Sequence, residues 1–174
     1  VQLNIIDQSQ TLNKALLTDA KDSVSKAMTD LRDIAKSLNS DRIKLSSLVE
    51  LTDYELQRIN RAGIMITSFV TKGTEQNMLQ HKKLFVYRII QEVLQNILKH
   101  SKATNIDIIF QYGKEKLAID ISDNGTGFDK ELITKKDGIG LQNIISRAAL
   151  IGGEAHINSN INKGTTLTII SPYA

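Results

Sequence analysis

The 174-residue chain contains no cysteine, no tryptophan and a single proline. The absence of cysteine excludes disulfides and thiolate metal sites. The three histidines, His81, His100 and His156, are scattered along the chain and do not have the spacing of metal ligands. No apolar run reaches the roughly 18 residues that a bilayer-spanning helix needs, and no signal peptide is visible.

Strong charge bias is also missing. Charged residues make up 24% of the chain and the net charge is +3. This mild basic character, without a dense basic block, is weak support for nucleic-acid binding, and we expect no nucleic-acid partner. A nucleotide phosphate or an ordinary solvated surface explains it equally well. With 41% hydrophobic residues, the chain can form one domain and an extension.

The first third of the chain has the pattern of a helical seam. Its apolar residues recur at alternating steps of three and four: Leu17, Ala20, Val24, Ala27, Leu31, Ile34 and Leu38. Such a heptad seam must be covered by another helix, and a dimeric four-helix bundle would bury it. A single amphipathic helix packed on its own domain is the alternative. We expect a break at 39–42 and a further helix, capped by Asp41, that ends near Asn60.

From Gly63 onward the pattern predicts an α+β fold. Helices and hairpins follow one another without regular strand–helix–strand alternation, which favours a mostly antiparallel sheet with helices on one face. The expected strands are 64–70, 106–112, a strand from 117 to about 123, 155–161 and 165–170. The expected helices are 84–100 and 141–151.

Asp123 is the first candidate ligand contact. Leu117, Ile119 and Ile121 share one face of a predicted strand, and the period of two places Asp123 on the same face. A carboxylate in a core-facing row is costly without a partner. Gly125 and Gly127 follow in the motif Asp-Asn-Gly-Thr-Gly-Phe and allow close approach of another group.

The helix 84–100 supplies a second candidate site. Its apolar face leaves Glu92, Asn96 and Lys99 together in one polar stripe. This stripe is either an ordinary wetted face or a row suited to a divalent cation and the polyphosphate that the cation neutralises.

Two glycine motifs follow. Gly138 and Gly140 lie where the helix that contains Leu141 begins, and free N–H groups at a helix start bind anions. A simple loop-to-helix turn would also explain them. Lys163-Gly164-Thr165 forms a tight turn, and Thr165 could offer a hydroxyl to the same site. The chain contains no Gly-x-x-x-x-Gly-Lys-Ser/Thr sequence, which excludes a P-loop.

The order of these motifs resembles that of sensor histidine kinases. The stretch from Gln91 to Ala103 resembles their N box, Asp123 to Phe128 the G1 box, Gly138 to Leu141 the G2 box, and Lys163 to Thr165 the closing glycine–threonine motif. Together they span about 82–172, roughly half the chain. The Gln-Glu-(x)3-Asn form of the N box is most similar to the NarL-partner type of kinase.

The resemblance implies a Bergerat-type two-layer α/β sandwich that binds ATP and Mg²⁺. It implies that Asp123 accepts a hydrogen bond from the adenine amino group. Asn96 would coordinate Mg²⁺, Glu92 would act as the catalytic residue beside the metal, and Lys99 would contact a phosphate.

The same resemblance implies roles for the small residues. Gly125 and Gly127 would make room for the base, and Thr165 would support the adenine. Gly138, Gly140 and Leu141 would belong to a lid that folds over the triphosphate.

We therefore expect 1–40 to be a remnant of dimerisation and phosphotransfer helices and 41–174 to be the catalytic domain. The resemblance implies a cytoplasmic location, a response regulator as partner, and a homodimer formed through the N-terminal helices, with a membrane anchor upstream left open. None of the three histidines fits the phosphoacceptor position, so we expect the acceptor upstream of Val1. The alternative is an ATP-binding regulatory module of the anti-sigma-factor type, which lacks a bundle seam.

Overall fold

The computed structural model describes residues 45–129 and 139–174. The chain divides into two units, Val1–Leu45 and Ser46–Ala174, and the description below concerns the second. The predicted heptad helix, Asp41 and Gly138 lie outside the described residues. The predictions made for the heptad helix, for Gly138 and for the domain limits at residue 40 therefore stay predictions.

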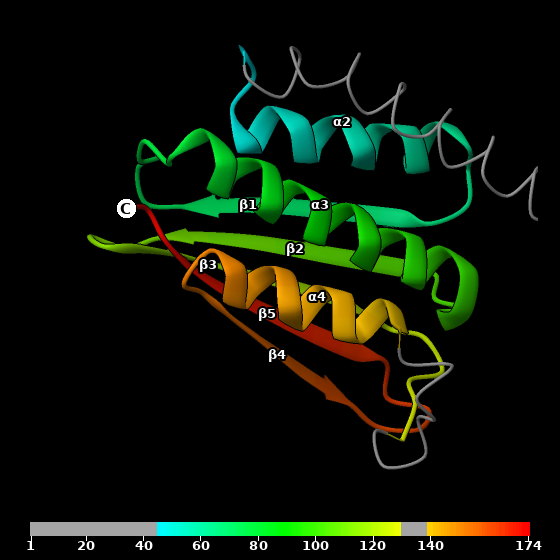
Figure 1. Cartoon of the computed structure of the whole chain (residues 1–174). Coiled ribbons are helices and arrows are strands. Elements are labelled where there is room, and N and C mark those ends of the chain that lie inside the picture. The colour runs from blue at the N-terminus through cyan, green and yellow to red at the C-terminus, as the bar shows by residue number, and fades with distance from the viewer. Residues whose placement is uncertain (1–44, 130–138) are drawn as a thin grey trace, which may run out of the picture. The chain divides into compact units, whose positions relative to one another are not determined.

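A five-stranded sheet forms one layer, in the order β1-β2-β3-β5-β4 (Figure 1). The strands are β1 (Ile66–Lys72), β2 (Asn105–Tyr112), β3 (Lys116–Asp123), β4 (Glu154–Ser159) and β5 (Thr165–Pro172). Three of the neighbouring pairs are antiparallel, as predicted. β1 and β2 are parallel, because the long helix between them returns the chain to the same edge before β2 begins.

Three helices form the second layer and lie on one face of the sheet (Figure 1). They are α2 (Leu48–Arg61), α3 (Gln80–Asn96), which continues into a π-helical turn η1 (Ile97–Ser101), and α4 (Ile139–Leu150). The predicted α+β sandwich with helices on one face is therefore confirmed.

The start of α2 differs from the prediction. Ser47 caps the helix: its hydroxyl accepts the Glu50 amide at 3.1 Å, and the Glu50 carboxylate accepts the Ser47 amide at 2.8 Å. This capping box stops the helix from extending toward the N-terminus. Leu45, within the range predicted for this helix, precedes it and is 88% exposed.

The core lies between the sheet and α3. Alternate residues of β2 and β3 point toward the helices, and their partners on α3 recur at helical spacing. The residues with almost no exposed surface include Ile106, Ile108, Phe110, Ile119, Ile121, Ile169, Val86, Ile89 and Ile90. This packing fixes α3 on the sheet and leaves its C-terminal half beside the end of β3.

Polar contacts hold α2 against α3. The Tyr87 hydroxyl and the Gln91 side-chain amide both donate to Oε1 of Glu55, at 2.7 Å and 2.8 Å. Because these contacts lie on the side of α3 that faces α2, the Glu92 and Asn96 side of α3 remains available to the neighbouring cavity.

Candidate functional site

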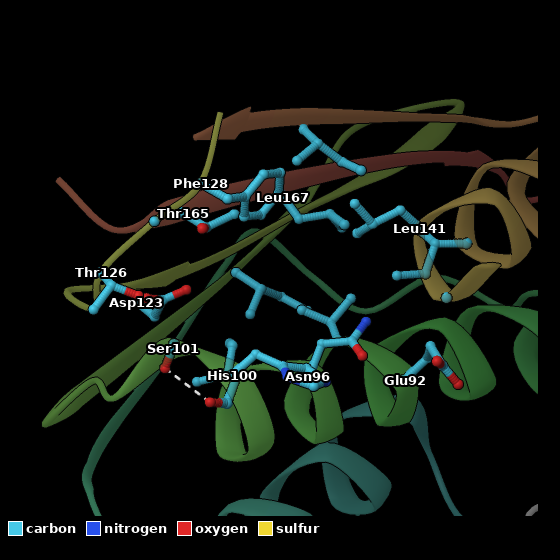
Figure 2. Close-up of a pocket in the computed structure, with 17 residues that line it drawn as sticks. Glu92, Asn96, His100, Ser101, Asp123, Thr126, Phe128, Leu141, Thr165 and Leu167 are labelled. Carbon is cyan, nitrogen blue, oxygen red and sulfur yellow. Dashed lines mark hydrogen bonds between the residues drawn. The ribbon is translucent and has the colours of Figure 1, made fainter. Parts of the chain in front are cut away.

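A cavity of about 520 Å³ lies between α3, η1, the end of β3, β5 and α4. Figure 2 shows Asp123, Thr126 and Thr165 at one end and Glu92 and Leu141 at the other, with Asn96 between them. The middle of the cavity is apolar. Its aliphatic lining residues are Val93, Ile97, Ile121, Leu141, Ile144, Ile157 and Leu167. A flat apolar group with a polar edge fits such a space, and a charged group fits its Glu92 end.

Asp123 is the last residue of β3 and is only 9% exposed. Burial raises the pKa of its carboxyl group, and hydrogen bonds from the backbone amides of Gly125 and Thr165 partly oppose that effect. The Gly125 amide donates to Oδ1 at 2.7 Å. The predicted inward-facing acid is therefore at the cavity and is held by the backbone of its own turn.

Glu92 and Asn96 lie one helical turn apart on α3, and both line the cavity. Gly140, at the start of α4, lies directly over them: a Cβ atom there would be 3.0 Å from Glu92 Oε1 and 3.4 Å from Asn96 Nδ2. Arg147 of α4 reaches Glu92 Oε2 at 4.0 Å. Glu92 and Asn96 thus form the row of an acid and an amide, and the start of α4 packs against both side chains.

The structure does not bring Lys99 to this cavity. Lys99 is exposed and lines a second groove, between α2 and α3, while His100 lines the cavity instead. The cause is η1, because a π-helical turn takes in more residues per turn than an α-helix. The smaller rotation per residue leaves Lys99 short of the stripe of Glu92 and Asn96 and brings His100 to it, so Lys99 does not lie in the row expected from ideal α-helical geometry.

The two glycines of the Asp123 loop serve packing of the chain on itself. A Cβ atom at Gly125 would lie 2.2 Å from the Ser101 carbonyl oxygen, so this glycine lets the loop touch the end of η1. Gly127 has φ +56°, and a Cβ atom there would lie 2.0 Å from the Asn160 carbonyl oxygen. Gly127 lines the cavity, but Gly125 is not among the lining residues. The close approach at Gly125 is therefore to Ser101 of the same chain.

Residues 81–174 match the model of the histidine kinase-, DNA gyrase B- and HSP90-like ATPase family. The match covers more than half of the chain and includes every element that lines the cavity. The chain belongs to this ATPase family.

Two curated relatives of this ATPase domain carry histidine kinase names. The chain is 27% identical over 86% of its length to the signal transduction histidine-protein kinase/phosphatase DegS of Brevibacillus brevis, and the aligned part is 42% of that protein. It is 29% identical over 99% of its length to the oxygen sensor histidine kinase NreB of Staphylococcus carnosus, of which it covers 50%. The chain thus spans half or less of the length of these relatives. Their names do not favour the anti-sigma-factor alternative.

Solved structures show the same fold. The ATP-binding domain of PrrB from Mycobacterium tuberculosis superposes with a TM-score of 0.60 at 21% identity, covering 74% of this chain and 96% of that one. The mycobacterial sensor histidine kinase MprB gives a TM-score of 0.55 at 17% identity, over 73% of this chain and 95% of that one.

Several cavity residues of the ATPase domain escaped the sequence interpretation. They are His100, Ser101, Thr126, Phe128, Ile144, Ile157 and Leu167, beside the other apolar lining residues. Strand alternation could have revealed Ile157 and Leu167, which are paired across β4 and β5 on the helix side of the sheet. His100 and Ser101 could not be found this way, because a π-turn leaves no periodic mark in the sequence. Gly140, Leu141 and Thr165, in contrast, line the cavity as predicted.

The residues present fit a magnesium ion that is shared with a phosphate group. Asn96 offers an amide oxygen and Glu92 a carboxylate, both hard oxygen donors on one side of the cavity. Within 45–129 and 139–174 no three His, Cys, Asp or Glu side chains gather in a way that could hold a metal by themselves. Mg²⁺ commonly takes only one or two protein ligands and completes its shell with waters and phosphate oxygens.

In the described part of the chain, no helix is long and apolar enough to cross a membrane.

Proposed function

We propose that this ATPase domain is the catalytic part of a sensor histidine kinase that transfers the γ-phosphate of ATP to a histidine and then to an aspartate of a response regulator. The observation that carries the proposal is the single cavity that joins Asp123 to Glu92 and Asn96 (Figure 2). The curated relatives bearing kinase names support it.

The Asp123 end of the cavity is suited to adenine. An ionised carboxylate only accepts hydrogen bonds, so Asp123 would bind the 6-amino group of adenine and repel the 6-carbonyl of guanine. The apolar middle, including Ile121 and Leu167, would contact the faces of the base. Base selection in this proposal rests on one buried acceptor.

The Glu92 end is suited to the phosphates. We propose that Asn96 holds Mg²⁺ through its amide oxygen and that Glu92 orients a water or the attacking group beside it. A bound magnesium ion would neutralise phosphate charge. Gly140 and Leu141 would lie over the triphosphate, and transfer would depend mainly on positioning and charge neutralisation.

In the longer protein we propose a homodimer formed through the N-terminal helices, with the acceptor histidine on one of those helices. A response regulator would then take the phosphate from that histidine. A cytoplasmic location for this domain follows from the same proposal, since response regulators are cytoplasmic partners of such kinases.

Calorimetric titration of the chain with ATP in the presence of Mg²⁺ tests the binding step. We expect Asp123→Asn to weaken ATP binding by about 1.5–3 kcal/mol, the range for a hydrogen bond to a charged group. Asp107→Asn is the matched control, because Asp107 is an exposed aspartate on β2 that is not among the cavity residues. Equal ATP affinity of the wild type and Asp123→Asn would mean that Asp123 has only a structural role.

A further inference from the structure

Ser159 lies directly behind the Asp123 end of the cavity. It is the last residue of β4, is 8% exposed, and pairs across the sheet with Thr165. Thr165 in turn pairs with Asp123. The three side chains thus follow one another across three neighbouring strands, and Asp123 and Thr165 line the cavity while Ser159 does not.

The hydrogen bonds of Ser159 favour one arrangement of protons, in which its hydroxyl donates to the Gly164 carbonyl. The Phe128 amide donates to Ser159 Oγ at 2.9 Å. The buried carbonyl oxygen of Gly164 lies 3.2 Å from Oγ and can only accept, so it takes the single hydroxyl proton of Ser159. Thr165 Oγ1 is 2.9 Å from Ser159 Oγ. Either hydroxyl could donate in this contact; when the Ser159 proton goes to the Gly164 carbonyl, the hydroxyl of Thr165 is the donor.

Thr165 therefore presents only lone pairs to the cavity. Asp123, when ionised, likewise presents only acceptors. Two acceptors side by side favour a ligand edge that carries an amino group, bound directly or through one water, and disfavour an edge that carries a carbonyl.

We propose that Ser159 is a positioning residue that fixes the direction of the Thr165 hydroxyl and so strengthens the preference of the site for a 6-amino purine over a 6-oxo purine. This inference rests on the proposed ATP binding. It assigns to Ser159 a part in base selection that does not require any contact with the nucleotide.

A purely structural role for Ser159 makes a different prediction. Loss of its hydroxyl would leave the Phe128 amide and the Gly164 carbonyl without this hydrogen-bond partner. The resulting loss of nucleotide affinity would not depend on the base. Every nucleotide would then bind more weakly by the same factor. The ratio of two affinities separates the two roles, whereas a single affinity does not.

The test compares ATP with inosine triphosphate, which carries a 6-oxo group in place of the 6-amino group. Calorimetry on the whole chain would give both dissociation constants for the wild type, Ser159→Ala, Ser159→Thr and Thr165→Val. In Ser159→Ala the Thr165 hydroxyl is free to donate to the 6-oxo group, and we expect the preference for ATP to fall by about five- to tenfold, the equivalent of one neutral hydrogen bond. Ser159→Thr, which keeps a hydroxyl, is expected to retain the wild-type preference.

Two further variants serve as controls for the Ser159→Ala measurement. Ser171→Ala is the matched control, because Ser171 is a fully buried serine of β5 that does not line the cavity. In a Thr165→Val background, Ser159→Ala is expected to leave the preference unchanged, since no hydroxyl remains to be oriented. Thr165→Val alone is expected to lower the preference, and it serves if Ser159→Ala does not fold.

The outcomes are distinguishable. A wild-type chain that binds neither nucleotide would overturn the proposed function. A wild type that prefers ATP, with an unchanged preference in Ser159→Ala or Thr165→Val, would overturn the role of Ser159 and leave ATP binding intact. If Ser159→Ala also changes the preference for ATP in the Thr165→Val background, the proposed role of Ser159 would likewise be overturned.

Discussion

Asp123 illustrates a residue whose burial carries a cost in stability. The residue is largely buried, and that burial raises the pKa of its carboxyl group above the ordinary value. The amides of Gly125 and Thr165 offset only part of the cost. A buried acid with a free edge in an apolar cavity is typical of functional sites, where perturbed pKa values concentrate.

The sign of this pKa shift predicts a trade-off between stability and binding. Because the pKa is higher in the folded than in the unfolded chain, the penalty is absent below the unfolded value and grows as pH rises through the folded value. Asp123→Asn keeps an oxygen for the Gly125 amide and removes the buried charge. We expect it to raise the free energy of unfolding of the nucleotide-free chain at pH 7 by about 1 kcal/mol or less, because solvent in the cavity screens part of the charge.

Urea denaturation at pH 7 and at pH 3 would check this prediction. The advantage of Asp123→Asn should shrink at pH 3, where the carboxyl of the wild type is protonated in both states. A variant that is less stable than the wild type at pH 7 would show that the charge itself holds the loop.

Among the elements, η1 decides which side chains of α3 reach the cavity. The Ser101 hydroxyl donates to the Ile97 carbonyl at 2.8 Å, and the Ser101 carbonyl accepts the Thr126 amide at 2.7 Å. Lys102, with φ +54°, ends the turn. The π-turn is therefore tied to the Asp123 loop, and π-turns of this kind occur frequently at functional sites.

This geometry predicts opposite behaviour for two neighbouring residues. His100 lines the cavity and Lys99 lines the other groove. We expect His100→Gln to weaken ATP binding by about three- to tenfold, the cost of one lost hydrogen bond. Lys99→Gln, which removes an exposed charge, should change the affinity by about twofold or less.

Titration of both variants with ATP at low and moderate salt would separate the contribution of the His100 contact from that of the Lys99 charge. If Lys99→Gln caused the larger loss at both salt concentrations, the α-helical alignment predicted from the sequence would describe the bound state better than η1 does.

At the scale of the whole molecule, the positions of the histidines bear on phosphotransfer. His81 lies near the start of α3, about 22 Å along the helix from Asn96 at 1.5 Å per residue. His156 is on β4, where neighbouring Ile157 lines the cavity, so His156 points to the opposite face of the sheet. His100 lies on the Asp123 side of Asn96, away from the Glu92 end proposed for the terminal phosphate (Figure 2).

We therefore expect the chain to bind ATP without phosphorylating itself. Incubation with γ-labelled ATP and Mg²⁺ should leave no acid-labile phosphate on it. Addition of a helical segment that carries an acceptor histidine should restore labelling, on that segment. Acid-labile label on the chain alone, removed by His100→Gln, would contradict this expectation.

Local patterns were enough for much of the fold. The apolar period of α3 predicted a buried face, which holds Val86, Ile89 and Ile90, and strand alternation placed Asp123 facing inward. Both predictions depend only on spacing along one element. The start of α2 was missed because Ser47 and Asp41 are both good caps, and only the paired contacts with Glu50 distinguish them. The parallel pairing of β1 was missed because it joins residues far apart in the chain.

The sequence by itself determined the elements, the buried faces and most of the motifs that meet in the cavity, since these follow from short-range periodicity and from the chemistry of single residues. Only the tertiary structure decided that His100 and not Lys99 lines the cavity, that Gly125 makes room for Ser101, and that Ser159 lies within hydrogen-bond distance of Thr165. These features arise from contacts between distant segments, whose energies depend on distances and angles that no local pattern encodes.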